Sequence, residues 1–146
     1  MIIEKIREDM NSARKGSDSV AKNLLITLFS EITMVGKNLR NGPTTDEESI
    51  STIKKFAANV EETISLLKAR SQDSTAQEHE LEILITYLPQ QMTRDAMIAA
   101  VSSIASTLNV SGPKAMGPIM AALKTQFVGK YDGKMASSIV KEILNN

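Results

Sequence analysis

The chain has 146 residues, of which 42% are hydrophobic and 23% are charged, so it can form one domain or two very small ones with a modest core. It contains no cysteine, which excludes disulfides and thiolate-bound metals and is typical of the reducing cytoplasm. No run of about 18 apolar residues occurs, and charged residues interrupt the N-terminal segment 1–6. We therefore expect a soluble, unexported, cytoplasmic protein without a membrane partner.

Basic and acidic side chains balance over the whole chain, with 17 of each, but they are unevenly distributed. Residues 1–90 carry 11 basic and 14 acidic side chains, whereas residues 91–146 carry 6 basic and 3 acidic ones. The basic second segment is compatible with a polyanionic partner, although a charge of this size also arises by chance in a short segment.

Apolar residues recur at steps of three and four rather than alternating, which predicts an all-α fold. A first helix is expected over residues 2–14, with Gly16 ending it. A second helix is expected to start near residues 17–19 and to end at residues 41–43, where Gly42 accepts the left-handed conformation and a proline follows. Gly36 lies inside it, where glycine costs roughly 1 kcal/mol relative to alanine.

A long third helix follows, because Thr45 and Glu48 have the spacing of a capping box. Its apolar positions repeat in alternating steps of three and four: Ile50, Ile53, Ala57, Val60, Ile64 and Leu67. Such a repeat also suits a coiled-coil seam between molecules. Because the second helix offers a matching stripe across a short loop, we expect a long antiparallel hairpin within the chain.

Thr75 and Glu78 predict another capping box, before a fourth helix that ends near Tyr87. Pro89 disfavours helical geometry at the preceding residue and marks the best candidate boundary. We therefore predict an N-terminal helical bundle over residues 1–89 and a C-terminal tail over residues 90–146.

The tail is expected to contain three helices. Thr93 can cap the first, which ends near Asn109. Gly117 and Pro118 resemble a cap followed by proline at the first helical position of the second helix. A turn over residues 129–133 precedes the last helix.

Common arrangements of catalytic groups are missing from the sequence. The sole histidine, His79, lies between Glu78 and Glu80 and is interpreted as an ordinary exposed residue. Close carboxylates fall in first helical turns or alternate around a helix, and the Gly-Lys pairs lack the pattern of a phosphate-binding loop. We expect no catalytic residue, no metal and no cofactor, and the chain is not expected to be an enzyme by itself.

The lysines of the second segment flank helix ends and glycine turns, as backbone-phosphate contacts often do: Lys114, Lys124, Lys130, Lys134 and Lys141. Lysines near helix C-termini also complement the helix dipole without any ligand. Only Phe127 and Tyr131 are aromatic in this half, so recognition of a folded RNA by its shape is favoured over stacking on single strands.

The residues of three segments together resemble the GatB/YqeY family. Residues 80–93, ELEILITYLPQQMT, are similar to the family's joining segment, a leucine-rich helix ending in Tyr-Leu-Pro and followed by Gln and a new helix cap. The closing signature is matched in order and spacing by residues 116–120 (MGPIM), Lys124, Gly129, Asp132, Gly133 and residues 139–144 (IVKEIL). The start fits the free-standing YqeY type through Ile6, Asp9, Met10, Ala13, Gly16 and Asp18. Pro118 departs from the pattern, since a lysine or another polar residue is expected there.

The resemblance implies an N-terminal helical bundle joined to a small helical tail. In the multisubunit tRNA-dependent amidotransferase, a similar tail of the B subunit helps to hold the misacylated tRNA. The carbon–nitrogen ligation with glutamine as amide donor belongs there to other domains. The implied function is therefore that of a non-catalytic accessory protein that binds tRNA or associates with components of an amidotransferase or an aminoacyl-tRNA synthetase.

Carried over by position, the implied tRNA-contacting residues are four lysines, with two glycines shaping the turn: Lys114, Lys124, Lys130, Lys134, Gly129 and Gly133. The alternative interpretation is a helical protein–protein adaptor that binds no RNA. Added salt separates the two, because phosphate binding weakens strongly with salt and an apolar helix interface does not.

Overall fold

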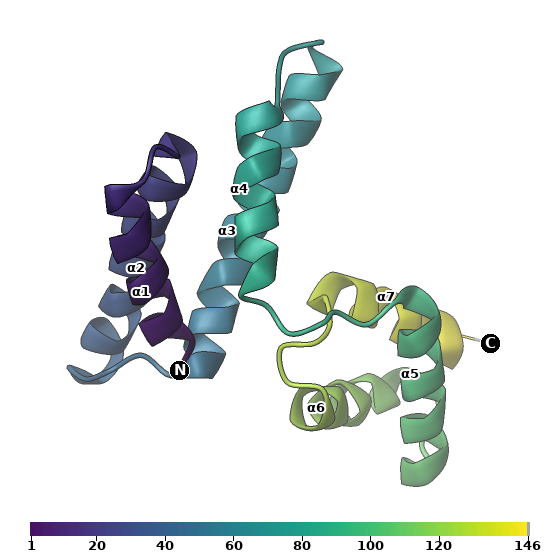
Figure 1. Ribbon diagram of the computed structural model, residues 1–146. Helices are drawn as coiled ribbons and strands as arrows, with labels where there is room; N and C mark the ends of the chain where they lie inside the picture. The colour runs from purple at the N-terminus through teal and green to yellow at the C-terminus, as the bar shows by residue number, and fades with distance from the viewer. Residues whose placement is uncertain (146) are drawn as a thin grey trace. The chain divides into compact units, whose positions relative to one another are not determined.

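A computed structural model describes residues 1–145, and over this range the chain forms helices and connecting loops without a strand (Figure 1). The predicted all-α class is confirmed. The chain divides into two compact units, the first over Met1–Leu88 and the second starting at Pro89. Each has its own hydrophobic core. No helix within the described residues is long and apolar enough to cross a membrane.

The first unit consists of four helices, α1 (Ile2–Lys15), α2 (Ser19–Arg40), α3 (Asp46–Ala69) and α4 (Thr75–Thr86). The most extensive packing is of α1 against α2 and of α3 against α4, as Figure 1 shows, while α2 also contacts α3 and α4. The core includes five apolar side chains that are fully buried: Ile6, Leu28, Ile32, Ile53 and Leu84. A hairpin of α2 and α3 is therefore not confirmed as the main packing of this unit.

The loop between α2 and α3 crosses α2 at Gly36. The buried hydroxyl of Thr44 accepts a hydrogen bond from the Gly36 N–H, at 3.0 Å, and donates to the carbonyl of Ile32 one turn earlier. Asn41, with φ of 53°, takes the left-handed conformation that ends α2, so the prediction that Gly42 would do so is wrong. Asparagine tolerates this conformation because its side chain is short and polar.

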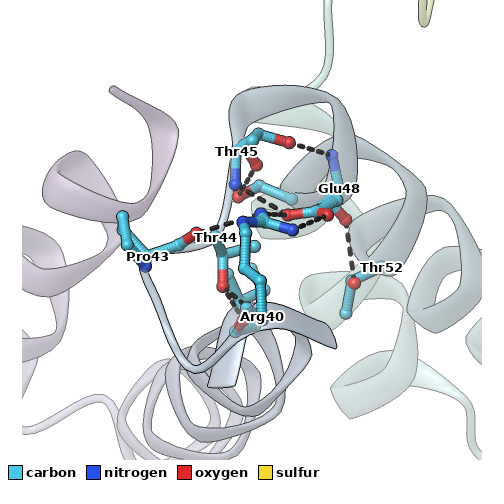
Figure 2. Close-up of polar contacts among 9 residues, drawn as sticks. Arg40, Pro43, Thr44, Thr45, Glu48 and Thr52 are labelled. Atoms are coloured by element: carbon cyan, nitrogen blue, oxygen red, sulfur yellow. Dashed lines mark hydrogen bonds and ion pairs between the residues drawn. The ribbon is translucent and has the colours of Figure 1, made fainter. Parts of the chain in front are cut away.

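The start of α3 is fixed by the predicted capping box, which is confirmed. Thr45 accepts from the Glu48 N–H and Glu48 accepts from the Thr45 N–H (Figure 2). Figure 2 also shows the two-pronged ion pair of the Arg40 guanidinium with the Glu48 carboxylate. The same Arg40 donates to the Pro43 carbonyl, so one arginine joins the end of α2, the loop and the start of α3.

The second predicted capping box, at Thr75 and Glu78, is wrong. Thr75 is the first residue of α4, and the N-cap residue Ser74 makes no side-chain capping bond. The Asp73 carboxylate instead accepts from both the backbone N–H and the hydroxyl of Thr75. A carboxylate two residues before a threonine competes for its hydroxyl and forms a local turn.

The second unit contains α5 (Arg94–Leu108), a 3₁₀ turn η1 (Pro113–Ala115), α6 (Met116–Gln126) and α7 (Gly133–Leu144). These helices enclose a core of apolar residues: Met97, Val101, Ile104, Ala115, Ile119, Leu123, Ala136, Ile139 and Val140. Thr93 caps α5 through the Ala96 N–H, and Asn109 ends it in the left-handed conformation. The expected N-cap of α5 at Thr93 and the expected helix end near Asn109 are therefore confirmed.

The predicted start of α6 at Gly117 and Pro118 is wrong, because α6 begins at Met116 and both residues lie in its first turn. A proline is accommodated there because the first N–H groups of a helix have no partner within it. A glycine at the cap followed by proline at the first helical position occurs instead at η1, where Gly112, with φ of 79°, precedes Pro113.

Candidate functional site

The connection between α6 and α7 is a turn that exposes a lysine between two anchored aromatic residues. Phe127 and Tyr131 are partly buried and pack against the core of the second unit. Between them, Gly129 has φ of 72°, in the left-handed region that favours glycine. Lys130 follows it with an exposed side chain, and its N–H donates to the Phe127 carbonyl at 3.0 Å. The turn therefore presents a cation on a backbone with fixed ends.

The segment that opens the second unit lies against this turn. The Met92 N–H donates to the Lys130 carbonyl at 2.7 Å. The side-chain amide of Gln91 donates to the Gly129 carbonyl at 2.9 Å and to the Pro89 carbonyl at 2.7 Å. The bonds from Met92 to Lys130 and from Gln91 to Gly129 each connect residues 38 positions apart in the chain, and sequence reasoning missed them.

The N-terminus of α7 adds a second exposed lysine next to the turn. Asp132 caps α7 by accepting from the Lys134 N–H at 3.1 Å, and the Lys134 side chain is exposed. Gly133 is the first residue of α7, and a Cβ there meets nothing within 4 Å. Of the two glycines expected to shape the turn, Gly129 is the one whose conformation favours glycine.

The remaining two lysines lie at opposite ends of α6. Lys124 is in its last turn, on the side of the 127–132 turn, while Lys114 lies in η1 before its start. Ten residues of mostly helical chain separate them by about 15 Å along the axis. Lys124, Lys130 and Lys134 thus lie in or next to the segment that joins α6 to α7, whereas Lys114 lies before the other end of α6.

None of these four exposed lysines makes an ion pair with a carboxylate of the described residues. By contrast, Arg94 at the start of α5 pairs with Glu142 on α7 at 2.7 Å. No neighbouring carboxylate therefore offsets the attraction of these lysines for an anionic ligand. Pro118 is exposed in the first turn of α6 and offers no donor to an anion.

The polar groups of the first unit hold its helices together. The half-exposed His79 on α4 contacts Asp18, the N-cap residue of α2, with 2.6 Å between Nε2 and Oδ2. The hydrogen bond with Asp18 raises the pKa of His79. The Ala21 N–H, followed by His79, lowers the pKa of Asp18. Sequence reasoning found no partner for this histidine, because Asp18 lies 61 residues earlier.

A shallow open pocket of about 270 Å³ lies beside α1, lined by Met1, Ile2, Lys5, Asp46, Thr86 and Tyr87. Its Asp46 carboxylate already accepts from the Ile2 N–H, and its Thr86 hydroxyl donates to the Ile83 carbonyl. The Tyr87 hydroxyl donates to the Asp9 carboxylate at 2.5 Å, and burial, followed by this bond, raises the pKa of Tyr87. The polar side-chain groups of Asp46, Thr86 and Tyr87 are therefore already used in hydrogen bonds within the protein.

No cluster of three or more His, Asp or Glu side chains suited to a metal ion occurs among residues 1–145. The carboxylates near His79 illustrate why: Asp18 serves as a helix cap, and Glu82 approaches the other ring nitrogen only to 3.8 Å. The exposed lysines of the second unit described above are cationic groups that an anionic ligand can contact.

A family model described as Yqey-like protein matches the chain over residues 3–144. The match spans both units and includes the 127–132 turn. No curated protein matches the chain closely enough to count as a relative.

Proposed function

Because the chain belongs to the Yqey-like protein family, we propose that it is a non-catalytic accessory protein whose second unit binds tRNA. The observation that carries the proposal is the segment joining α6 to α7, in or next to which Lys124, Lys130 and Lys134 are exposed and lack carboxylate partners within the described residues. Amidotransferase or aminoacyl-tRNA synthetase components are the proteins with which such an accessory would associate, as the resemblance to the amidotransferase tail implies.

The chemistry of the site suits a phosphate backbone rather than a base. A lysine ammonium is a compact point charge on a flexible stem, which binds phosphate without reading sequence. The two aromatic residues of the turn, Phe127 and Tyr131, are partly buried in the core of the unit, so they are poorly placed to stack on extruded bases. Recognition of a folded RNA by its shape and backbone is the mode that these features support.

Binding of the purified protein to bulk tRNA and to duplex DNA, each at low and near-physiological salt, tests the proposal. We expect a preference for tRNA and a steep loss of affinity with added salt. Each phosphate that the protein neutralises should add roughly −0.7 to −0.9 to the slope of log binding constant against log salt concentration. An absence of binding to tRNA at low salt contradicts the proposal.

The double variant Lys130→Glu plus Lys134→Glu tests the assignment of the site. It is expected to weaken tRNA binding and to reduce the salt slope by about two, because two phosphate contacts are lost. An acidic residue at position 134, in the first turn of α7, suits the helix dipole, so the unit should stay folded.

Lys37→Glu plus Lys55→Glu is the matched control, since both lysines are exposed on helices of the first unit and the net charge changes equally. Similar losses of affinity in the two double variants would show a general charge effect and remove the site assignment.

A protein–protein adaptor is the second candidate. It is favoured by large apolar side chains that the first unit leaves more than half exposed, namely Met1, Leu39, Leu66 and Ile85. Exposed apolar residues scattered singly are also common on soluble proteins. An apolar interface predicts partner binding that changes little with salt, which separates this candidate from the tRNA proposal.

The accessory role predicts no catalysis by the chain alone. Incubation with glutamine, ATP and misacylated tRNA is expected to give no amidated product. Product formation by the purified chain would contradict the accessory role.

A further inference from the structure

Gln91 is an exposed residue outside any helix, yet its side-chain amide makes two hydrogen bonds. Both acceptors, the carbonyls of Pro89 and Gly129, can only accept, so the NH₂ group and not the amide oxygen must face them. A solvated surface glutamine has no need of such an arrangement. This side chain bridges the first residue of the second unit and the turn between α6 and α7.

The neighbouring backbone extends the bridge. The Met92 N–H donates to the Lys130 carbonyl, so two consecutive residues hold the consecutive carbonyls of Gly129 and Lys130. The Lys130 N–H donates back to Phe127. The backbone of Lys130 is thus held at both its N–H and its carbonyl, while its side chain is exposed.

A turn of this kind lies in no helix or strand and includes a left-handed glycine that is free to adopt other conformations. Without hydrogen bonds to the rest of the unit, a lysine on such a turn samples many positions. Ligand binding must then order the turn at an entropic cost. Hydrogen bonds that order the turn in the free protein reduce that cost. The position of Gln91 therefore matters for any ligand that Lys130 binds.

We propose that Gln91 is a positioning residue that holds the Gly129–Lys130 turn so that Lys130 meets an RNA phosphate. This inference rests on the proposed function, and it adds a residue that itself need not touch the ligand. Its action goes through the Gly129 carbonyl and is supported by the adjacent bond from Met92.

Gln91→Met tests the inference, because methionine has a similar length and no donor. We expect tRNA binding to weaken about fivefold, the factor that corresponds to one hydrogen bond. The fold should be retained, since the residue is exposed and lies outside the helices.

A pair of double-mutant cycles distinguishes positioning from a general loss of stability. In a Lys130→Ala background, Gln91→Met should have no further effect, because the side chain that it positions is gone. In a Lys114→Ala background, with the lysine at the opposite end of α6, the fivefold loss should persist. Additive losses in both cycles overturn the inference.

Heteronuclear NOE values of the Gly129 and Lys130 amides, measured without RNA, give a readout independent of affinity. Gln91→Met should lower both values and leave those of α5 and α6 unchanged. Failure of the wild-type protein to bind tRNA overturns the proposed function and the role of Gln91 together. Wild-type binding with unchanged NOE values or affinity in Gln91→Met overturns the role of Gln91 alone.

Discussion

Gly36 and Thr44 are packed backbone against backbone: a Cβ on Gly36 would lie 2.6 Å from the Thr44 amide nitrogen and 2.5 Å from the Gly42 carbonyl oxygen. The Thr44 hydroxyl, itself buried, accepts from the Gly36 N–H at this crossing. Glycine has a low helix propensity inside α2, but here it lets the backbone of the following loop pass close to the helix. A residue with a Cβ would block this close approach.

Gly36→Ala is accordingly expected to destabilise the first unit by about 2 kcal/mol or more, because backbone atoms rather than a flexible side chain must move. Gly117→Ala is the matched control, since a Cβ at that position in α6 meets nothing within 4 Å. It is expected to be neutral or stabilising by up to about 1 kcal/mol. Urea denaturation of both variants checks the contrast, and equal effects would contradict the close-packing argument.

The Tyr87 side chain is largely buried, and its hydroxyl donates a hydrogen bond to the Asp9 carboxylate. Tyr87→Phe removes this hydroxyl and keeps the ring. The expected loss is about 1 kcal/mol of unfolding free energy, since the ring packing is kept and one hydrogen bond is lost. Asp9→Asn alters the same contact. If the Tyr87→Phe plus Asp9→Asn double variant is as stable as the less stable single variant, the two side chains share one interaction. Fully additive losses of stability would contradict this.

The contact between His79 and Asp18 makes the stability of the first unit depend on pH. The pKa of His79 is raised in the fold, so its contribution is fully present below the unfolded value of about 6.5 and is lost as pH rises through the folded value. The pKa of Asp18 is lowered, so its contribution is present above about 3.9 and is lost on acidification through the folded value.

The contact should therefore be strongest between about pH 4 and 6.5. Urea midpoints of the wild type and His79→Gln, measured from pH 5 to 9, are expected to converge above neutrality. A difference between the two proteins that stays constant to pH 9 would rule out the charged contact.

Glu48 is the acidic partner in the contacts around Arg40. The bond with the Arg40 guanidinium, followed by the Thr45 N–H, lowers the pKa of Glu48 to about 2. Its contribution is thus present above the unfolded value of roughly 4.3 and is lost as pH falls toward 2. Glu48→Gln should be less stable than the wild type at pH 6, and the difference should shrink at pH 2. An NMR titration of the Glu48 carboxylate with a midpoint near 4.3 would refute the assignment.

Local signals predicted much of the fold. The three-and-four spacing of apolar residues gave the all-α class, and the Thr45 box and the Thr93 cap are correct because each depends on residues within one helical turn. Where two neighbouring residues competed for the same hydrogen bond or the same turn position, the sequence-based prediction chose the wrong one. Asp73 took the Thr75 hydroxyl, and Asn41 rather than Gly42 adopted the left-handed conformation.

Contacts across long stretches of chain were beyond such reasoning. The hydrogen bond from Gln91 to Gly129 and the contact of His79 with Asp18 depend on how the chain packs in three dimensions. No local sequence motif marks either pair of residues as partners. The exposure of Lys130 and Lys134 follows from their charge and from the turn signals around them. Their contact with tRNA stays a prediction.

The chain contains two tyrosines and no tryptophan, and Tyr87 belongs to the first unit whereas Tyr131 belongs to the second. Each ring packs against the core of its own unit. The tyrosine fluorescence of the protein therefore comes from one residue in each unit. Tyr87→Phe leaves Tyr131 as the sole fluorophore of that type, and Tyr131→Phe leaves Tyr87. The two variants can thus show, without any attached dye, whether the units melt together or one at a time.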